Sequence, residues 1–230
     1  MTSMNLQATD EILQAAEHLP GGATLVVPQV AWDDYERLLQ DLAERPRMRV
    51  SYDCGRLEIV SPLPEHEEYA DFLNDLVRAY ADAYDMELEK RGHATWKRKA
   101  LEKGAEADAC YYVRSAERII GKRTIDLESD PPPDIVVEID TTRNSLTKFP
   151  IYAALSVPEI WRYDGQKVHL FELADGQYIP ISESRFLPKL TGQMLAEAME
   201  LSKTRGQKTA LKAFRRRIRS RKNRNGQRVV

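Results

Sequence analysis

A short run of β-branched residues constrains the fold of this chain more than any other feature. The stretch PPPDIVVEIDTTRNSLTK, residues 131–148, places the run IVVEI between two aspartates. A run of this length after prolines predicts a strand buried on both faces, at the centre of a mixed sheet. Alternate residues of a strand share a face, so one face combines Val136 with three acids, Asp134, Glu138 and Asp140. The opposite face is wholly apolar.

These acids and those of an earlier segment predict a divalent-metal site. Glu106 and Asp108 alternate in GAEADACYYV, a second extended segment. If the two strands are neighbours, Asp108 and Glu138 approach closely enough to share a hard cation such as Mg²⁺, which prefers carboxylate oxygens. Lys148, one turn into the next helix, is then placed to orient a water or stabilise developing negative charge. Spacing alone favours the alternative, a solvated strand face with Lys148 as a surface charge.

The flanking acids have structural alternatives as well. Asp134 follows three prolines and could cap the start of the strand rather than bind metal. Asp140 could be a third metal ligand, or it could fix Lys148 through an ion pair.

Hydrophobic periodicity along the chain predicts an α/β or α+β fold. Helical periods occur at residues 9–19, 32–45, 64–89 and about 192–219, and extended segments at 23–32, 48–62, 93–99, 106–114, 159–173 and 176–182. A short helix is expected from about Lys148 to Leu155, with Thr147 as its cap and Pro150 in its first turn. The sequence therefore predicts a mixed central β-sheet flanked by helices, with an added β-hairpin around Asp164-Gly165.

The charge distribution separates a basic tail from an acidic body. From Ser202 to the end there are 12 of the 34 Lys and Arg residues and none of the 36 Asp and Glu residues. The other 201 residues thus hold 22 basic and 36 acidic groups, a net charge of −14. We expect one domain over 1–201, with 1–62 packing on 63–201, and a basic helix with a frayed tail over 202–230.

The tail is a candidate for contact with nucleic acid, because clustered cations neutralise phosphates. The candidate residues are Arg215, Arg216, Arg217 and Arg219. Two alternatives remain open, a solvated helix end and a tail that docks on the acidic body. Phe214 is the lone aromatic residue there, whereas stacking on bases would require more.

Other features exclude whole classes of protein. No apolar run approaches the roughly 18 residues of a membrane helix, and the start of the chain lacks the basic and apolar regions of a secretory signal. Cys54 and Cys110 have no metal-ligand spacing, and a cytoplasmic chain with two reduced thiols is expected.

Three blocks of the sequence resemble one known family. GRLEIVSPLPEHEEYADFL, the segment 104–113 and PPPDIVVEIDTTRNSLTKFPIYAALSVPEIWRYDG are similar, in this order, to the Uma-two family of endonucleases. That family belongs to the PD-(D/E)XK, restriction-endonuclease-like superfamily. The resemblance extends from about Ala23 to near Phe214. It implies a restriction-endonuclease-like core, a sheet flanked by helices with a divalent metal at one end.

The resemblance also implies roles for individual residues. Asp108 and Glu138 match the acids that bind metal, and Lys148 matches a lysine displaced from the strand into the next helix. His66 and Glu67 match an HE pair that completes the site. In the alternative interpretation, His66 has no catalytic role and is simply a polar residue in the first turn of a helix. The acids beside it would be favoured there by the helix dipole.

Two positions depart from the pattern that the resemblance implies. Asp140 stands where the superfamily has a lysine in the strand. Lys148 is therefore the candidate for the role of that lysine. Ala107 stands where relatives usually have proline, a change that removes no ligand.

The implied activity is hydrolysis of phosphodiester bonds, with DNA as substrate, Mg²⁺ or Mn²⁺ as cofactor, a 5′-phosphate as product and a homodimer as assembly. Two alternatives stay open. One is a catalytically inactive nuclease fold that binds nucleic acid or a protein partner. The other is an interaction or structural protein, because the acidic body would repel DNA.

Overall fold

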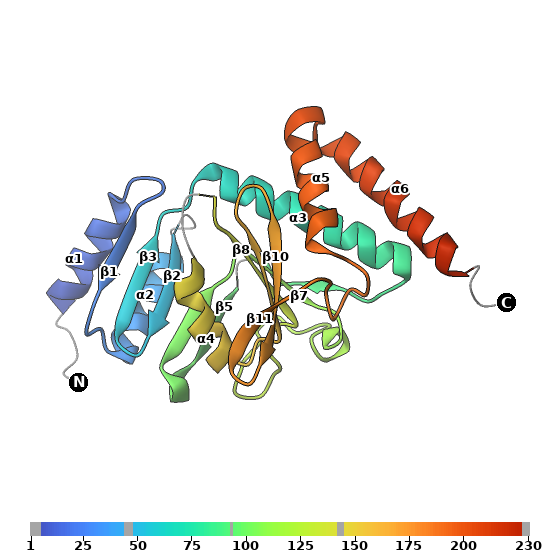
Figure 1. The fold of residues 1–230 in the computed structure, drawn as a ribbon. Coiled ribbons are helices and arrows are strands. Elements are labelled where there is room, and N and C mark those ends of the chain that lie inside the picture. Colours follow the sequence, from blue (N-terminus) through green and yellow to red (C-terminus); the bar gives the residue numbers. More distant parts are fainter. Residues whose placement is uncertain (1–5, 44–47, 93, 142–144, 227–230) are drawn as a thin grey trace.

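The strands that the structure describes form two β-sheets (Figure 1). The structure is a computed structural model, and it describes residues 6–43, 48–92, 94–141 and 145–226. The described α-helices are α1 Leu6–Glu17, α2 Trp32–Ala43, α3 Pro64–Tyr84, α4 Phe149–Ala154, α5 Gly192–Arg205 and α6 Gln207–Gly226. The strands are β1 Thr24–Val27, β2 Arg49–Asp53, β3 Arg56–Val60, β4 Glu89–Lys90, β5 Thr95–Arg98, β6 Lys103–Glu106, β7 Ala109–Tyr112, β8 Ile135–Ile139, β9 Glu159–Tyr163, β10 Val168–Ala174 and β11 Gln177–Ile181.

The larger sheet is mixed, and β8 lies near its centre. Its order is β11-β10-β9-β8-β7-β4, with β8 and β9 parallel and every other pair antiparallel. Ile135, Val137 and Ile139 pack toward α3, α5 and α6, whereas Val136 packs toward α4. The run IVVEI is therefore buried on both faces, and the predicted mixed α+β fold is confirmed, with the expected hairpin formed by β9 and β10.

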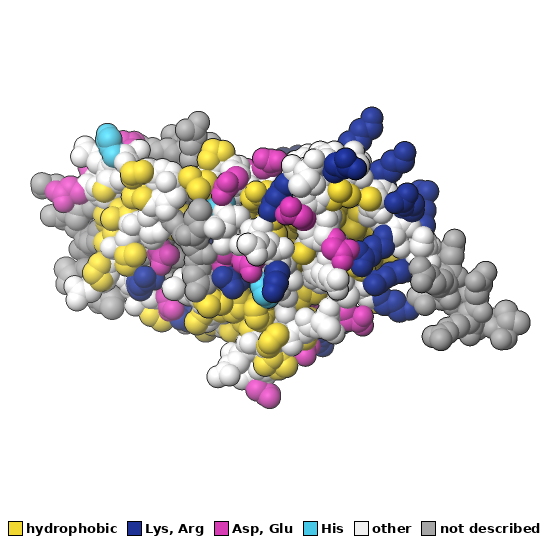
Figure 2. Space-filling model, turned by 45° about the horizontal axis from the view of Figure 1, so that its top comes forward, with side chains coloured by type: hydrophobic (Ala, Val, Ile, Leu, Met, Phe, Trp, Pro, Cys, Tyr) yellow, Lys and Arg dark blue, Asp and Glu magenta, His cyan; other side chains and the backbone are white. Residues whose placement is uncertain are grey.

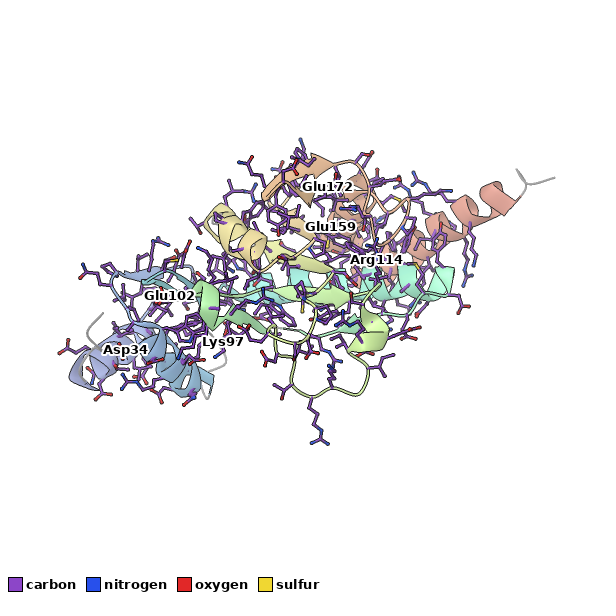
Figure 3. The ribbon with its side chains drawn as sticks, turned by 90° about the horizontal axis from the view of Figure 1, so that it is seen from below. Asp34, Lys97, Glu102, Arg114, Glu159 and Glu172 are labelled. Atoms are coloured by element: carbon purple, nitrogen blue, oxygen red, sulfur yellow. The ribbon has the colours of Figure 1, made fainter. Side chains whose placement is uncertain are left out.

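The smaller sheet has five antiparallel strands in the order β1-β3-β2-β6-β5 and was not foreseen. Residues of α1 and α2 pack with it around Tyr35, Tyr52 and Leu57. In Figure 3, Asp34 and Lys97 lie with this sheet, and Glu159 and Glu172 lie with the larger one.

The chain passes from the smaller sheet to the larger one within two residues, 107 and 108. β6 ends at Glu106 and β7 begins at Ala109, so the single strand expected over 106–114 is wrong. Asp108 lies at this junction, where neither sheet contains it.

The helices on either side of β8 set the positions of the other candidate residues. α3 begins with Pro64. Proline is tolerated in the first turn of a helix, because a backbone N–H at that position would have no partner within the helix. α4 follows a 3₁₀ turn, Ser145–Lys148, and Lys148 occupies its N-cap position. The expectation that Thr147 caps this helix is therefore wrong. The side chain of Lys148 makes no cap bond and is free to point elsewhere.

The C-terminal helical segment is interrupted. The expected single helix is two, because Gly206 adopts a φ of 81° between α5 and α6. Gly192, Met194 and Met199 of α5 and Ala210, Phe214 and Ile218 of α6 are buried. The division at residues 201 and 202 stays a prediction, and the end of the tail after Gly226 lies outside the described residues. No helix in the described ranges combines the length and apolarity needed to cross a membrane.

Candidate functional site

The pairing of β7 with β8 brings Asp108 beside Glu138. Ala109 is opposite Val137 in this antiparallel ladder, as the metal hypothesis required. The backbone N–H of Asp108 donates to the carbonyl oxygen of Val137 over 3.1 Å. Its Oδ2 accepts from the N–H of Ile139 over 2.7 Å. Asp108 is thus fixed to the residues immediately before and after Glu138.

Glu138 is held by two side chains from the segment that follows it. Lys148 Nζ donates to Glu138 Oε2 over 2.8 Å and to the carbonyl oxygen of Glu106 over 3.0 Å. The Tyr152 hydroxyl donates to Glu138 Oε1 over 2.5 Å. Glu138 is only 2% exposed. Tyr152 follows Lys148 by four residues, so both side chains lie on one face of the helical segment and reach the same carboxylate.

Burial and neighbouring charges set the protonation of this group. Burial raises the pKa of Glu138 to about 7; the nearby charge of Asp108 also raises it, while Lys148 and the bond from Tyr152 oppose the rise. Burial alone would lower the pKa of Lys148, but the carboxylates of Glu138 and Asp108 raise it above its ordinary value. Lys148 is therefore a cation at neutral pH, and Glu138 is poised between its two forms.

The raised pKa of Glu138 predicts a pH-dependent stability of the metal-free protein. The folded state binds this proton more tightly than the unfolded state, so the free energy of unfolding falls as the pH rises from about 4.5 to about 7. Above about pH 7 the free energy of unfolding has fallen by the full amount, on the order of 3 kcal/mol. Urea unfolding in EDTA, compared with Glu138→Gln at each pH, measures it. Parallel pH profiles for the two proteins would contradict the prediction.

Arg49 of β2 links the acids across the two sheets. Its guanidinium donates to Glu67 Oε1 in the first turn of α3, and its Nε lies 3.7 Å from Asp108 Oδ1. Arg49 is only 6% exposed. Arg49 was not predicted as a site residue, because its only local signal in the sequence is a cation at the start of a strand. Glu67 therefore reaches the site through Arg49.

His66 is buried near the end of β8, where it contacts Thr141. The Thr141 hydroxyl donates to Glu65 Oε1 over 2.9 Å. Because a hydroxyl has one hydrogen to donate, His66 Nε2 donates to Thr141 Oγ1 over 2.8 Å. His66 therefore secures the end of β8.

The two acids that flank β8, Asp134 and Asp140, have structural partners. Asp134 accepts bonds from the backbone N–H groups of Val113 and Ser115, which matches the capping alternative. Asp140 accepts from the backbone and hydroxyl of Ser145 and pairs with Arg162. Of the two alternatives for Asp140, the direct ion pair with Lys148 is not formed, because Ser145 and Arg162 bond to its carboxylate oxygens.

The side chain of Glu106 is hydrogen-bonded within the smaller sheet. Its side chain accepts from the N–H of Val50 over 3.1 Å and from the hydroxyl of Thr95 over 2.9 Å, both in the smaller sheet. The chain changes sheets between Glu106 and Asp108, so the two acids do not share the face of one strand, as their alternation in sequence had suggested. The backbone carbonyl of Glu106 accepts from Lys148. Burial raises the pKa of the Glu106 carboxylate, and the nearby charges of Arg49 and Lys148 oppose this rise.

A cleft of about 400 Å³ opens beside Asp108. It is lined by Glu67, Glu68, Ala70, Asp71, Asn74, Gly92 and Asp108. Within the described ranges, no three His, Cys, Asp or Glu side chains cluster as a ready-made metal site. Asp108 and Glu138 nevertheless fit a hard cation such as Mg²⁺, which retains several waters and needs few carboxylates. A bound cation would offset the negative charge of Asp108, which adds to the effect of burial in raising the pKa of Glu138.

The four candidate arginines of the tail lie on α6, apart from the catalytic candidates. Arg215, Arg216 and Arg219 are exposed, and Arg217 pairs with Glu197 of α5. Figure 2 shows lysine and arginine side chains gathered over this end of the molecule.

Comparison with known proteins identifies the family. A family model named Uma2 and described as "Putative restriction endonuclease" matches residues 32–203. A crystal structure of a "putative nuclease belonging to DUF820" from Anabaena variabilis is similar over 73% of this chain and 97% of that one, at 14% identity and a TM-score of 0.49. No curated protein matched the chain. Because the family match covers well over half of the sequence, the chain belongs to the Uma2 family, as its resemblance to that family indicated.

Proposed function

We propose that this protein is a divalent-metal-dependent endonuclease that hydrolyses phosphodiester bonds of DNA. The observation that carries the proposal is the contact of Lys148 Nζ with Glu138 Oε2, over 2.8 Å, beside the carboxylate of Asp108. Two acids and a lysine at one end of a central strand match the arrangement that the family resemblance implies. Membership of a family described as restriction endonucleases supports the same reaction class.

Asp108 and Glu138 are the residues that would hold the ion. Their carboxylate oxygens are the ligands that Mg²⁺ and Mn²⁺ prefer. A bound ion of this kind supplies Lewis acidity, which polarises a phosphate and lowers the pKa of a bound water. The N–H of Ile139 and the hydroxyl of Tyr152 hold the two carboxylates in place while they share this task.

Lys148 would act on charge that develops during the reaction. Its ammonium is held by Glu138 and by the carbonyl of Glu106, so little reorganisation is needed to present it to a phosphate or a water. A cation that is fixed in a buried position stabilises a developing negative charge more strongly than one in water. The raised pKa of Lys148 keeps it charged for this role.

Removal of metal provides the direct test of this function. Purified protein should nick supercoiled plasmid in Mg²⁺ or Mn²⁺ and should lose all activity in EDTA, with 5′-phosphate ends on the product. Glu138→Gln, prepared identically, should be inactive, which separates the protein's activity from that of a contaminant. Equal nicking by Glu138→Gln, or nicking that persists in EDTA, would overturn the assignment.

Two observations favour a second candidate, an inactive nuclease fold that binds nucleic acid or a protein partner. Both oxygens of Glu138 already accept bonds from protein groups, and the described residues hold no cluster of three metal ligands. Such a module would bind DNA equally well in EDTA and in Mg²⁺ and would not cut it. The plasmid assay together with a binding assay distinguishes the two candidates.

The nuclease proposal carries further expectations about its setting. Mg²⁺ or Mn²⁺ is the expected ion, a homodimer the expected assembly and the cytoplasm the expected location. Light scattering of the purified chain measures the assembly directly.

A further inference from the structure

α6 carries two opposite faces along its length. Ala210, Phe214 and Ile218 recur every four residues, and all three are buried in the core shared with α3 and α5. At 100° per residue, the opposite side of the helix presents five cations. These residues, which we call the basic stripe, are Lys208, Lys212, Arg215, Arg216 and Arg219, and each is exposed.

The cations of the basic stripe are not used in the fold. Within the described part of the chain, none of the five has an acidic partner, whereas Arg217 of the same helix pairs with Glu197. Five unpaired cations repel one another, which raises the free energy of the isolated protein and is relieved by an anionic ligand. A shallow groove of about 880 Å³ follows the stripe and includes all five side chains.

The direction of α6 relates the stripe to the candidate active site. Just before α6, Lys203 of α5 lies over the rings of Tyr69 and Tyr163. Tyr69 is one turn along α3 from His66. Near the end of α6, Lys222 Nζ donates to the carbonyl of Ala83 and lies over Tyr84. α6 therefore runs toward the C-terminal end of α3, as Figure 1 shows, and Lys203, just before α6, is the residue that lies closer to the first turn of α3.

We propose that the basic stripe of α6 is the docking surface for the phosphate backbone of the DNA substrate. This inference rests on the proposed function, since it names the surface that holds the same substrate. The stripe spans about 16 Å at 1.5 Å per residue, long enough to meet successive phosphates of one strand. The body of the protein carries a net charge of −14, so α6 is where a polyanion is least repelled. The stripe also lies outside the residues that match the family model, 32–203.

Salt-dependent binding of a duplex tests the proposal without requiring cleavage. The probe is a fluorescein-labelled duplex of about 30 base pairs in EDTA, titrated at several salt concentrations. Arg215→Gln/Arg216→Gln/Arg219→Gln should lower the affinity at least about tenfold at low salt and reduce the slope of log K against log[salt] by about 3. The matched control is Arg56→Gln/Lys99→Gln/Lys122→Gln, which removes the same charge from exposed residues paired with Glu58, Asp33 and Asp130.

Each outcome decides the matter. Loss of affinity in the stripe variant, with wild-type binding by the control, supports the docking surface. Equal losses in both variants mean that only net charge matters, and unchanged binding by the stripe variant means that the stripe is unused; either result overturns the inference. Binding to phosphatidylserine vesicles in place of the duplex overturns it as well. An inactive protein that still shows stripe-dependent binding would refute the nuclease and leave the docking surface intact.

Discussion

Replacement of Lys148 by methionine should lower the rate of DNA cleavage by about 10²- to 10³-fold, the usual effect of removing one group that stabilises developing charge. Methionine fills much of the same volume but cannot donate to Glu138 or to the Glu106 carbonyl. Rates of plasmid nicking under single-turnover conditions in Mg²⁺ measure the effect on the chemical step.

The fold should survive this change, at reduced stability. Loss of one partner of a buried ion pair destabilises by about 3–5 kcal/mol when the remaining charge stays buried. Here Glu138 already titrates near pH 7, so it can take up a proton and lose its charge. Urea unfolding of Lys148→Met shows whether enough folded protein is present to interpret the rate.

Lys97→Met provides a matched control for the chemistry of the substitution. Lys97 also pairs with a single glutamate, Glu36, but it lies on β5 in the smaller sheet. Its replacement should leave the cleavage rate unchanged. If Lys148→Met retains a rate within threefold of the wild type, the lysine has no role in charge stabilisation and the proposed arrangement is wrong.

Replacement of Gly192 by alanine should destabilise the protein by more than about 3 kcal/mol, at the upper end of the range for overpacking. Gly192 is the first residue of α5, which Thr191 caps by accepting from the N–H of Met194. A Cβ at Gly192 would lie 1.9 Å from the backbone carbonyl oxygen of Val168 in β10. Backbone cannot move aside as a side chain can, so α5 would have to lift from the sheet. The midpoint of urea unfolding measures the loss.

Gly21→Ala is the matched control for this substitution. Its new Cβ would meet only the tip of the Leu63 side chain, at 3.3 Å, and Gly21 does not adopt a left-handed φ. We expect a change of less than about 1 kcal/mol there. Gly192→Ala should also weaken DNA binding, since α6 depends on α5 for its position. A Gly192→Ala protein as stable as the Gly21→Ala protein would contradict the close approach of α5 to β10.

The sequence by itself determined the features that depend on residues near one another in the chain. Alternation along a strand placed Glu138 on the opposite face from Ile135, Val137 and Ile139, and the structure places these three in the core against α3. The four-residue spacing of Lys148 and Tyr152 also places both side chains on one face of a helix. This spacing is visible in the sequence and could have predicted that both reach the same carboxylate. The mixed sheet followed from such local patterns, whereas the family was indicated by the resemblance of three sequence blocks to its members.

Only the tertiary structure decided how distant segments meet. Arg49 lies beside Asp108 and Glu67 because β2 pairs with β6, and no periodicity in the sequence encodes that pairing. The change of sheets at residues 107 and 108 gives Glu106 hydrogen-bond partners in the smaller sheet, although Glu106 and Asp108 alternate in sequence. Asp140 pairs with Arg162, which lies on the neighbouring parallel strand, and not with Lys148. The physical reason is the same in each case. Local sequence sets the face on which a side chain lies, whereas the partner that it meets there depends on which strands and helices pack together.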